Sequence, residues 1–245
     1  MRSLIILLVS VTASFAHADS VKIDNKAPKK GAKWTQEKSS VAKFTVETKG
    51  KSMPMVITEI ERKTIEVLDT KADLVTKAKI TYVKKSKSRG DKPTTDPLEG
   101  KTFTLTAGEP VVVEPETDAD AVRRAESRFG KPDRIRAAVG GREYTKGMVI
   151  DISNSAANDM FGEDTEVTKF TLEYSGMDGK NPKFKVQLEA STKVPIPMKV
   201  VLGGTVVLDP ATADSLSIDL TGTMKSTGGD TKLDGTMTMS GHRVM

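Results

Sequence analysis

Short stretches of alternating apolar and polar residues recur along most of the chain and predict β-strands. In the clearest run, Phe170, Leu172 and Tyr174 alternate with polar residues. Further apolar runs follow at 184–190, 196–208, 216–224 and 233–239. Because successive side chains of a strand point to opposite faces of a sheet, such runs predict half-buried strands. Consecutive strands joined by short turns predict an antiparallel meander.

Glycines fall inside these strands, at Gly203 and Gly204 and again at Gly235 and Gly241. Glycine inside a strand is typical of a bulge or a bend, and bent strands are needed to curve a sheet. The predicted fold class is therefore mainly β. We expect a curved antiparallel sheet, a partial barrel or sandwich, with a short helical insert.

The first half of the chain also carries strand patterns, from about residue 41 to residue 113. Leu74, Ala78, Ile80 and Tyr82 share one parity, as a half-buried strand requires. Residues 84–101 are rich in Lys and contain Pro93 and Pro97, which predicts a long exposed loop.

The helical insert is predicted near residues 117–141. Thr117 or Asp118 is a candidate N-cap for a helix in which apolar residues recur at every fourth position, followed by Gly130 at the expected C-terminal position. Pro132 suits the first turn of a second short helix that runs to Val139.

The first eighteen residues have the pattern of a secretion signal. Arg2 precedes an apolar run from Leu4 to Val11, and Ala16 and Ala18 form an A-x-A cleavage site. We predict that residues 1–18 are a signal peptide, that 19–38 form a flexible basic segment, and that 39–245 form one β-rich domain. The protein is expected to be exported, to the periplasm or the medium, with no transmembrane helix after cleavage.

Charge and cysteine content narrow the chemistry. The chain has no cysteine, so thiol catalysis and disulfides are excluded. Residues 19–101 carry 20 basic and 12 acidic residues. A basic segment can attract anionic lipid headgroups, although a solvated tether explains the same charges. Only Trp34 lies near these charges for base stacking, so nucleic acid is not an expected partner.

No catalytic or metal-binding motif is found. His242 is the one histidine after the signal peptide, and its parity is opposite to Met237 and Met239, which predicts an exposed strand residue. Ser40 and Lys43 match S-x-x-K, but the motifs that accompany it in serine acylases are missing. We therefore predict a protein that is not an enzyme and uses no cofactor or metal.

Methionines are the candidate ligand-binding residues. Two M-x-M pairs place both thioethers of each pair on one face of a strand. Such side chains fill a core, line an apolar cavity or, with less support here, bind Cu(I). The candidates are Met53, Met55, Met198, Met224, Met237 and Met239.

The order of elements over residues 40–245 resembles uncharacterised exported bacterial β-rich proteins and, more distantly, the periplasmic lipoprotein-carrier family. The helical insert Asp118–Val139 and the meander Phe170–Val244 carry this resemblance. It implies a curved sheet with helices over its concave face, which would bind acyl chains. The favoured hypothesis is an envelope protein that binds an apolar or lipid-like ligand, or a protein partner. Two alternatives are a structural or adhesive β module that acts through its loops and a hydrolase that uses dispersed carboxylates.

Overall fold

The computed structural model describes residues 20–90, 92–131, 134–152, 157, 165–192, 197–226 and 231–244. The predicted signal peptide, residues 1–18, lies outside the described residues, as does the predicted turn at 228–230.

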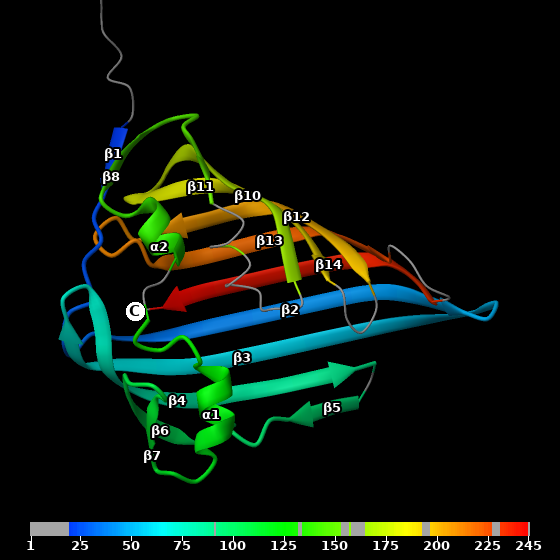
Figure 1. Ribbon diagram of the computed structural model, residues 1–245, viewed down its shortest axis with the longest axis horizontal. Helices are drawn as coiled ribbons and strands as arrows, with labels where there is room; N and C mark the ends of the chain where they lie inside the picture. Colours follow the sequence, from blue (N-terminus) through cyan, green and yellow to red (C-terminus); the bar gives the residue numbers. More distant parts are fainter. Residues whose placement is uncertain are drawn as a thin grey trace, which may run out of the picture.

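One large antiparallel sheet of 12 strands forms most of the molecule (Figure 1). In order across the sheet, its strands are β7 (Val112–Glu114), β6 (Thr102–Thr106), β4 (Leu74–Arg89), β3 (Lys51–Lys71), β2 (Lys33–Thr48), β14 (Thr231–Val244), β13 (Ser215–Ser226), β12 (Met198–Leu208), β11 (Asn181–Thr192), β10 (Thr165–Asp178) and β9 (Val149–Asp151), with β5 (Lys92–Thr95) paired to β4. Strands β10 to β14 form the predicted meander. The last strand, β14, pairs with β2 along its whole length and so joins the two halves of the chain.

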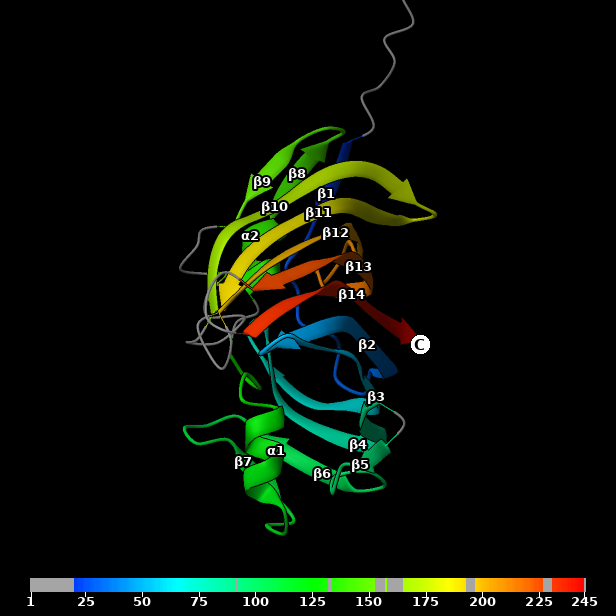
Figure 2. The same ribbon diagram turned by 90° about the vertical axis from the view of Figure 1, so that its right-hand side faces the viewer.

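The sheet is curved and not closed, because its edge strands β7 and β9 do not pair with each other. Both helices, α1 (Ala119–Ala125) and α2 (Arg134–Val139), lie on the concave face (Figure 2). The predicted fold class, a curved antiparallel sheet with a short helical insert, is confirmed.

Each helix covers one hydrophobic core on the concave face. The first core lies under α2 and is formed mainly by β10 to β13, where Tyr144, Tyr174 and Phe184 pack with ring centroids 5.3–6.2 Å apart. The second core lies under α1 and includes Phe103 and Leu105 of β6. The concave residues of β2 belong to neither core.

The residues after Ser20 differ from the predicted flexible segment. β1 (Ser20–Ile23) pairs with β8 (Arg142–Thr145), and β2 begins at Lys33. Ile23 is fully buried in the first core, and Asn25 accepts a hydrogen bond from Arg136 of α2 at 2.6 Å. The many lysines of this segment suggested a solvated tether. Their charged ends reach solvent while Ile23 packs into the core and holds the segment in place.

Two other local predictions are wrong. Within the predicted loop 84–101, residues 84–89 belong to β4 and residues 92–95 form β5, and lysines of β4 pair with glutamates of β3. Asp118 precedes α1 but adopts a left-handed conformation and makes no side-chain cap. Its carboxylate instead binds Lys101 at 2.5 Å. The helix ends at Ala125, so Gly130 lies beyond its C-terminus.

Candidate functional site

All six candidate methionines lie on the concave face of the sheet. Strand pairing puts Met55 opposite Phe44, Phe44 opposite Gly235, and Gly235 opposite Met224. One residue pair along, the row is Met53, Val46 and Leu233. Since neighbours in one row share a face, residues as far apart in the chain as Phe44 and Gly235 form one surface.

We define the apolar strip as the concave-face residues at the end of the sheet where β2 and β3 meet in a hairpin. Met53 is 58% exposed, and the other members range from half-buried to buried. The members are Phe44, Val46, Met53, Met55, Ile57, Met224, Leu233 and Met237. An exposed contiguous apolar surface of this kind is typical of a binding site.

The strip is accessible because neither helix reaches it. α2 packs on the first core and α1 on the second, and none of the strip residues on β2 and β3 belongs to either core (Figure 2). Strand β4 pairs with β3 from Ile57 onward, and the Gly90 N–H donates to the Val56 carbonyl, so among the described residues 51–55 of β3 have no strand partner on that side. Pro54 is tolerated there because an edge strand needs no donor on its outer side.

Met198 and Met239 lie at the margins of the strip. Met198 is at the start of β12, and Met239 packs against the first core, as Met237 also does in part. The structure therefore brings four of the six candidates, Met53, Met55, Met224 and Met237, into one surface. Sequence reasoning missed Phe44, Val46 and Ile57. Ile57 shares the parity of Met53 and Met55 on β3, which was a usable signal, whereas Phe44 and Val46 join them only through the register of β2.

A cluster of charged side chains adjoins the strip on the same face. Lys63 of β3 is 5% exposed, and its ammonium lies 2.5 Å from Glu126, which follows α1, and 3.5 Å from Glu61. The Tyr82 hydroxyl donates to the same Glu126 oxygen at 2.8 Å. Lys85 lies 3.3 Å from Glu61 and 5.0 Å from the centre of the Tyr82 ring. These contacts fasten the end of α1 to the sheet.

The protonation of this cluster follows from its burial and pairing. Burial lowers the pKa of Lys63, but Glu126 and Glu61 raise it further, so its pKa lies above the usual lysine value. Burial raises the pKa of Glu61, but Lys63, Lys85 and Lys38 outweigh it, so the pKa of Glu61 is lowered. Burial and Glu126 raise the pKa of Tyr82. At neutral pH Lys63 and Glu61 are therefore ionised, and the Tyr82 phenol is a hydrogen-bond donor.

Lys38 is the member of this cluster without a partner. It lies opposite Glu61 on β3 and Gly241 on β14, and among the described residues no carboxylate is within ion-pair distance of it. The Lys38 side chain is exposed, but the surrounding residues of the concave face partly desolvate its ammonium. This desolvation, followed by the charge of Lys63, lowers the pKa of Lys38.

A pocket of about 390 Å³ opens between α1 and the loop before β6. Its polar lining comes from Lys85, Asp96 and Arg124, and Pro97, Leu98, Ala121 and Ala125 complete its wall. One oxygen of Asp96 accepts the Leu98 backbone N–H at 2.9 Å, so this carboxylate also holds the loop in shape.

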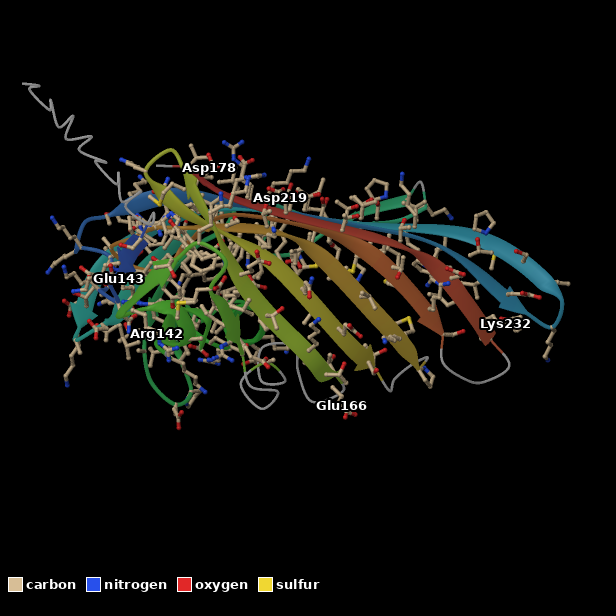
Figure 3. The ribbon with its side chains drawn as sticks, turned by 90° about the horizontal axis from the view of Figure 1, so that it is seen from above. Arg142, Glu143, Glu166, Asp178, Asp219 and Lys232 are labelled. Carbon is tan, nitrogen blue, oxygen red and sulfur yellow. The ribbon has the colours of Figure 1, made fainter. Side chains whose placement is uncertain are left out.

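His242 occupies the opposite, convex face. It is exposed, as predicted, and its Nε2 lies 3.9 Å from Asp219, which projects from the convex side (Figure 3). Among the residues that the structure describes, no group of three or more His, Cys, Asp or Glu side chains could hold a metal ion.

Comparisons with known proteins give distant similarities only. No family model and no curated protein matches the chain. Among solved structures, the chain is similar to DynF from the dynemicin biosynthesis pathway of Micromonospora chersina, with 8% identity, a TM-score of 0.25, and coverage of 92% of this chain and 87% of that one. It is also similar to Ail, the attachment invasion locus protein of Yersinia pestis, with 8% identity, a TM-score of 0.19, and coverage of 88% and 99%.

These scores are too low to carry an argument about function. The resemblance to lipoprotein carriers stays a prediction. Within the described ranges, no helix is long and apolar enough to cross a membrane.

Proposed function

We propose that the protein is exported and binds an apolar, lipid-like ligand on the apolar strip, without catalysing a reaction. The observation that carries this proposal is the row of methionine and aliphatic side chains on the concave face, of which Met53 is exposed and Met55, Ile57, Phe44, Val46 and Met237 are half-buried. Flexible, polarisable methionines adapt to ligands of varied shape, and concave apolar surfaces bury more of a ligand than flat ones. The secretion-signal pattern of residues 1–18 supports the location.

The pairing of carboxylates disfavours the hydrolase alternative. Glu61 and Glu126 both contact Lys63, and the pKa of Glu61 is lowered, whereas a general acid needs a raised pKa. A structural or adhesive module, or a protein partner on the strip, remains an outcome of the test below.

Titration of the mature protein, residues 19–245, with N-phenyl-1-naphthylamine tests the proposal. This neutral apolar probe brightens when it leaves water, so we expect saturable fluorescence. The double substitution Met53→Gln and Met55→Gln should weaken binding roughly tenfold, because the loss of two apolar contacts costs about 1.4 kcal/mol. Met177→Gln is the matched control, since Met177 is also exposed (45%) but lies at the β10–β11 hairpin.

The absence of saturable binding would overturn the proposal, and so would an equal loss in the Met177 variant. Mass spectrometry of an organic extract of the purified protein is the complementary test, with a co-purifying lipid as the expected result. If Met177→Gln weakens probe binding and the Met53/Met55 double variant does not, the result would favour a protein that acts through its exposed loops.

A further inference from the structure

We propose that the ligand is a single-chain amphiphile with a monoanionic head, such as a fatty acid, whose carboxylate lies at the α1 pocket between Lys85 and Arg124, beside Lys38, and whose chain runs to the apolar strip. This inference rests on the proposed function and assigns its ligand class.

The pocket offers cations that the protein does not use for its own ion pairs. Arg124 lines the pocket, and among the described residues neither Arg124 nor Lys38 has a carboxylate within ion-pair distance. Lys85 also lines the pocket and is shared with Glu61 at 3.3 Å. A guanidinium and an ammonium that converge on one hollow are the donors that a carboxylate prefers.

The charged residues that line the pocket favour a single negative charge. Lys85 and Arg124 are cations and Asp96 is a carboxylate, so the described lining has an excess of one positive charge. A monoanionic head neutralises this excess, whereas a dianion would reverse its sign.

The concave face of β2 and β3 connects this cluster with the strip. On β2 the concave residues between Lys38 and Phe44 are Ser40 and Ala42, and on β3 Glu59, opposite Ser40, pairs with Lys87. Ile57, the strip member nearest to Glu61 along β3, is four residues away, about 13 Å at the rise of a strand. A dodecyl chain spans this distance with its head at the pocket and its end on the strip.

The lowered pKa of Lys38 agrees with this arrangement, because burial and Lys63 disfavour its charge when the site is empty. The groups that face it are Lys63, Lys85, Glu61 and Glu126. A bound carboxylate would relieve that penalty.

Displacement of N-phenyl-1-naphthylamine by dodecanoate, dodecanol and dodecyl phosphate tests the inference. We expect dodecanoate to compete about tenfold better than dodecanol. Arg124→Gln and Lys38→Gln should each weaken dodecanoate about tenfold and leave dodecanol unchanged. The charge-matched controls are Lys43→Gln, on the convex face of β2, and Arg142→Gln, on β8 (Figure 3), which should change neither.

The outcomes separate the two claims. If neither dodecanoate nor dodecanol displaces the probe, the proposed function fails. If both compete equally and the Arg124 and Lys38 variants change nothing, only the assignment of an anionic head fails. Dodecyl phosphate that binds tenfold tighter than dodecanoate would overturn the monoanionic head in favour of a phosphate.

Discussion

At the scale of single residues, Glu126 connects α1 to the sheet. Its carboxylate receives the Lys63 ammonium and the Tyr82 hydroxyl, and all three side chains are largely shielded from water. A buried ammonium without its partner is costly, so the stability of this corner depends on the pair being complete.

We expect Glu126→Gln to lower the free energy of unfolding by about 3 kcal/mol, because it removes the closer of the two carboxylates that compensate the buried Lys63 ammonium. Gln keeps an acceptor for Tyr82, so the loss reports on the charge. Urea denaturation measures it. Glu116→Gln is the control, since Glu116 binds Arg123 but is 76% exposed, and it should change stability by less than about 0.5 kcal/mol. Equal effects would refute the role of Glu126.

The lowered pKa of Glu61 predicts a dependence of stability on pH. The pKa of Glu61 in the folded protein lies below the ordinary glutamate value of 4.5, so the ionised carboxylate stabilises the fold above pH 4.5. This contribution is lost as the pH falls through the folded-state pKa. The stability difference between the wild type and Glu61→Gln should therefore be largest near neutral pH and shrink below pH 4.5. Urea denaturation of both proteins over a pH series measures this difference. A stability difference that does not change with pH would contradict the prediction.

Residue identity alone could not reveal this cluster. Lys63 and Glu126 are 63 positions apart, and Tyr82 and Glu126 are 44 apart, so no local spacing links them. The position of His242, in contrast, followed from the parity of a single strand.

At the scale of elements, glycines bend three neighbouring strands. Gly204, Gly222 and Gly235 lie on the concave face of β12, β13 and β14, each one row further along than the last. A Cβ at Gly204 would collide with the backbone of Asp219, and one at Gly222 with the backbone of Val201. Only glycine permits this close approach, and the diagonal arrangement curves the sheet.

Gly204→Ala should therefore cost about 1–3 kcal/mol of stability, because the backbone of β13 has to move. Gly203→Ala is a control one residue away. Its Cβ would meet only the Val186 carbonyl oxygen at 3.8 Å, an ordinary contact. We expect that variant to stay within about 0.5 kcal/mol of the wild type in thermal or urea unfolding. A larger loss for Gly203→Ala than for Gly204→Ala would contradict the bend.

Alternation predicted most strands, including the meander, and the apolar spacing of every fourth residue with its flanking Gly and Pro predicted the two helices of the insert. Alternation failed to predict strands whose charged residues pair with charged residues on a neighbouring strand. The lysines of β4 looked like those of a loop, but Lys85 and Lys87 pair across the sheet with Glu61 and Glu59. A strand stabilised by cross-strand ion pairs shows no apolar alternation, so its pattern cannot be distinguished from that of a solvated segment.

At the scale of the whole molecule, the candidate site depends on a pairing between the two ends of the chain. β2 contributes Phe44 and β14 contributes Met237, and the strip is continuous only because these strands are adjacent. The sequence indicated which methionines share a face within one strand. It could not indicate that this pairing would put both methionine pairs on one surface, because register between distant strands leaves no local pattern.

Methionine-methyl NMR of the mature protein, titrated with octadecanoate, whose chain is long enough to reach Met55, tests the central claim most directly. Eight methionines lie in the described part of the chain, and six are on the concave face. We predict that the methyl signals of Met53, Met55, Met224 and Met237 shift with ligand, while those of Met148 and Met177 do not. Shifts confined to Met148 and Met177, or no shift at saturating ligand, would contradict the claim that the concave strip binds the ligand.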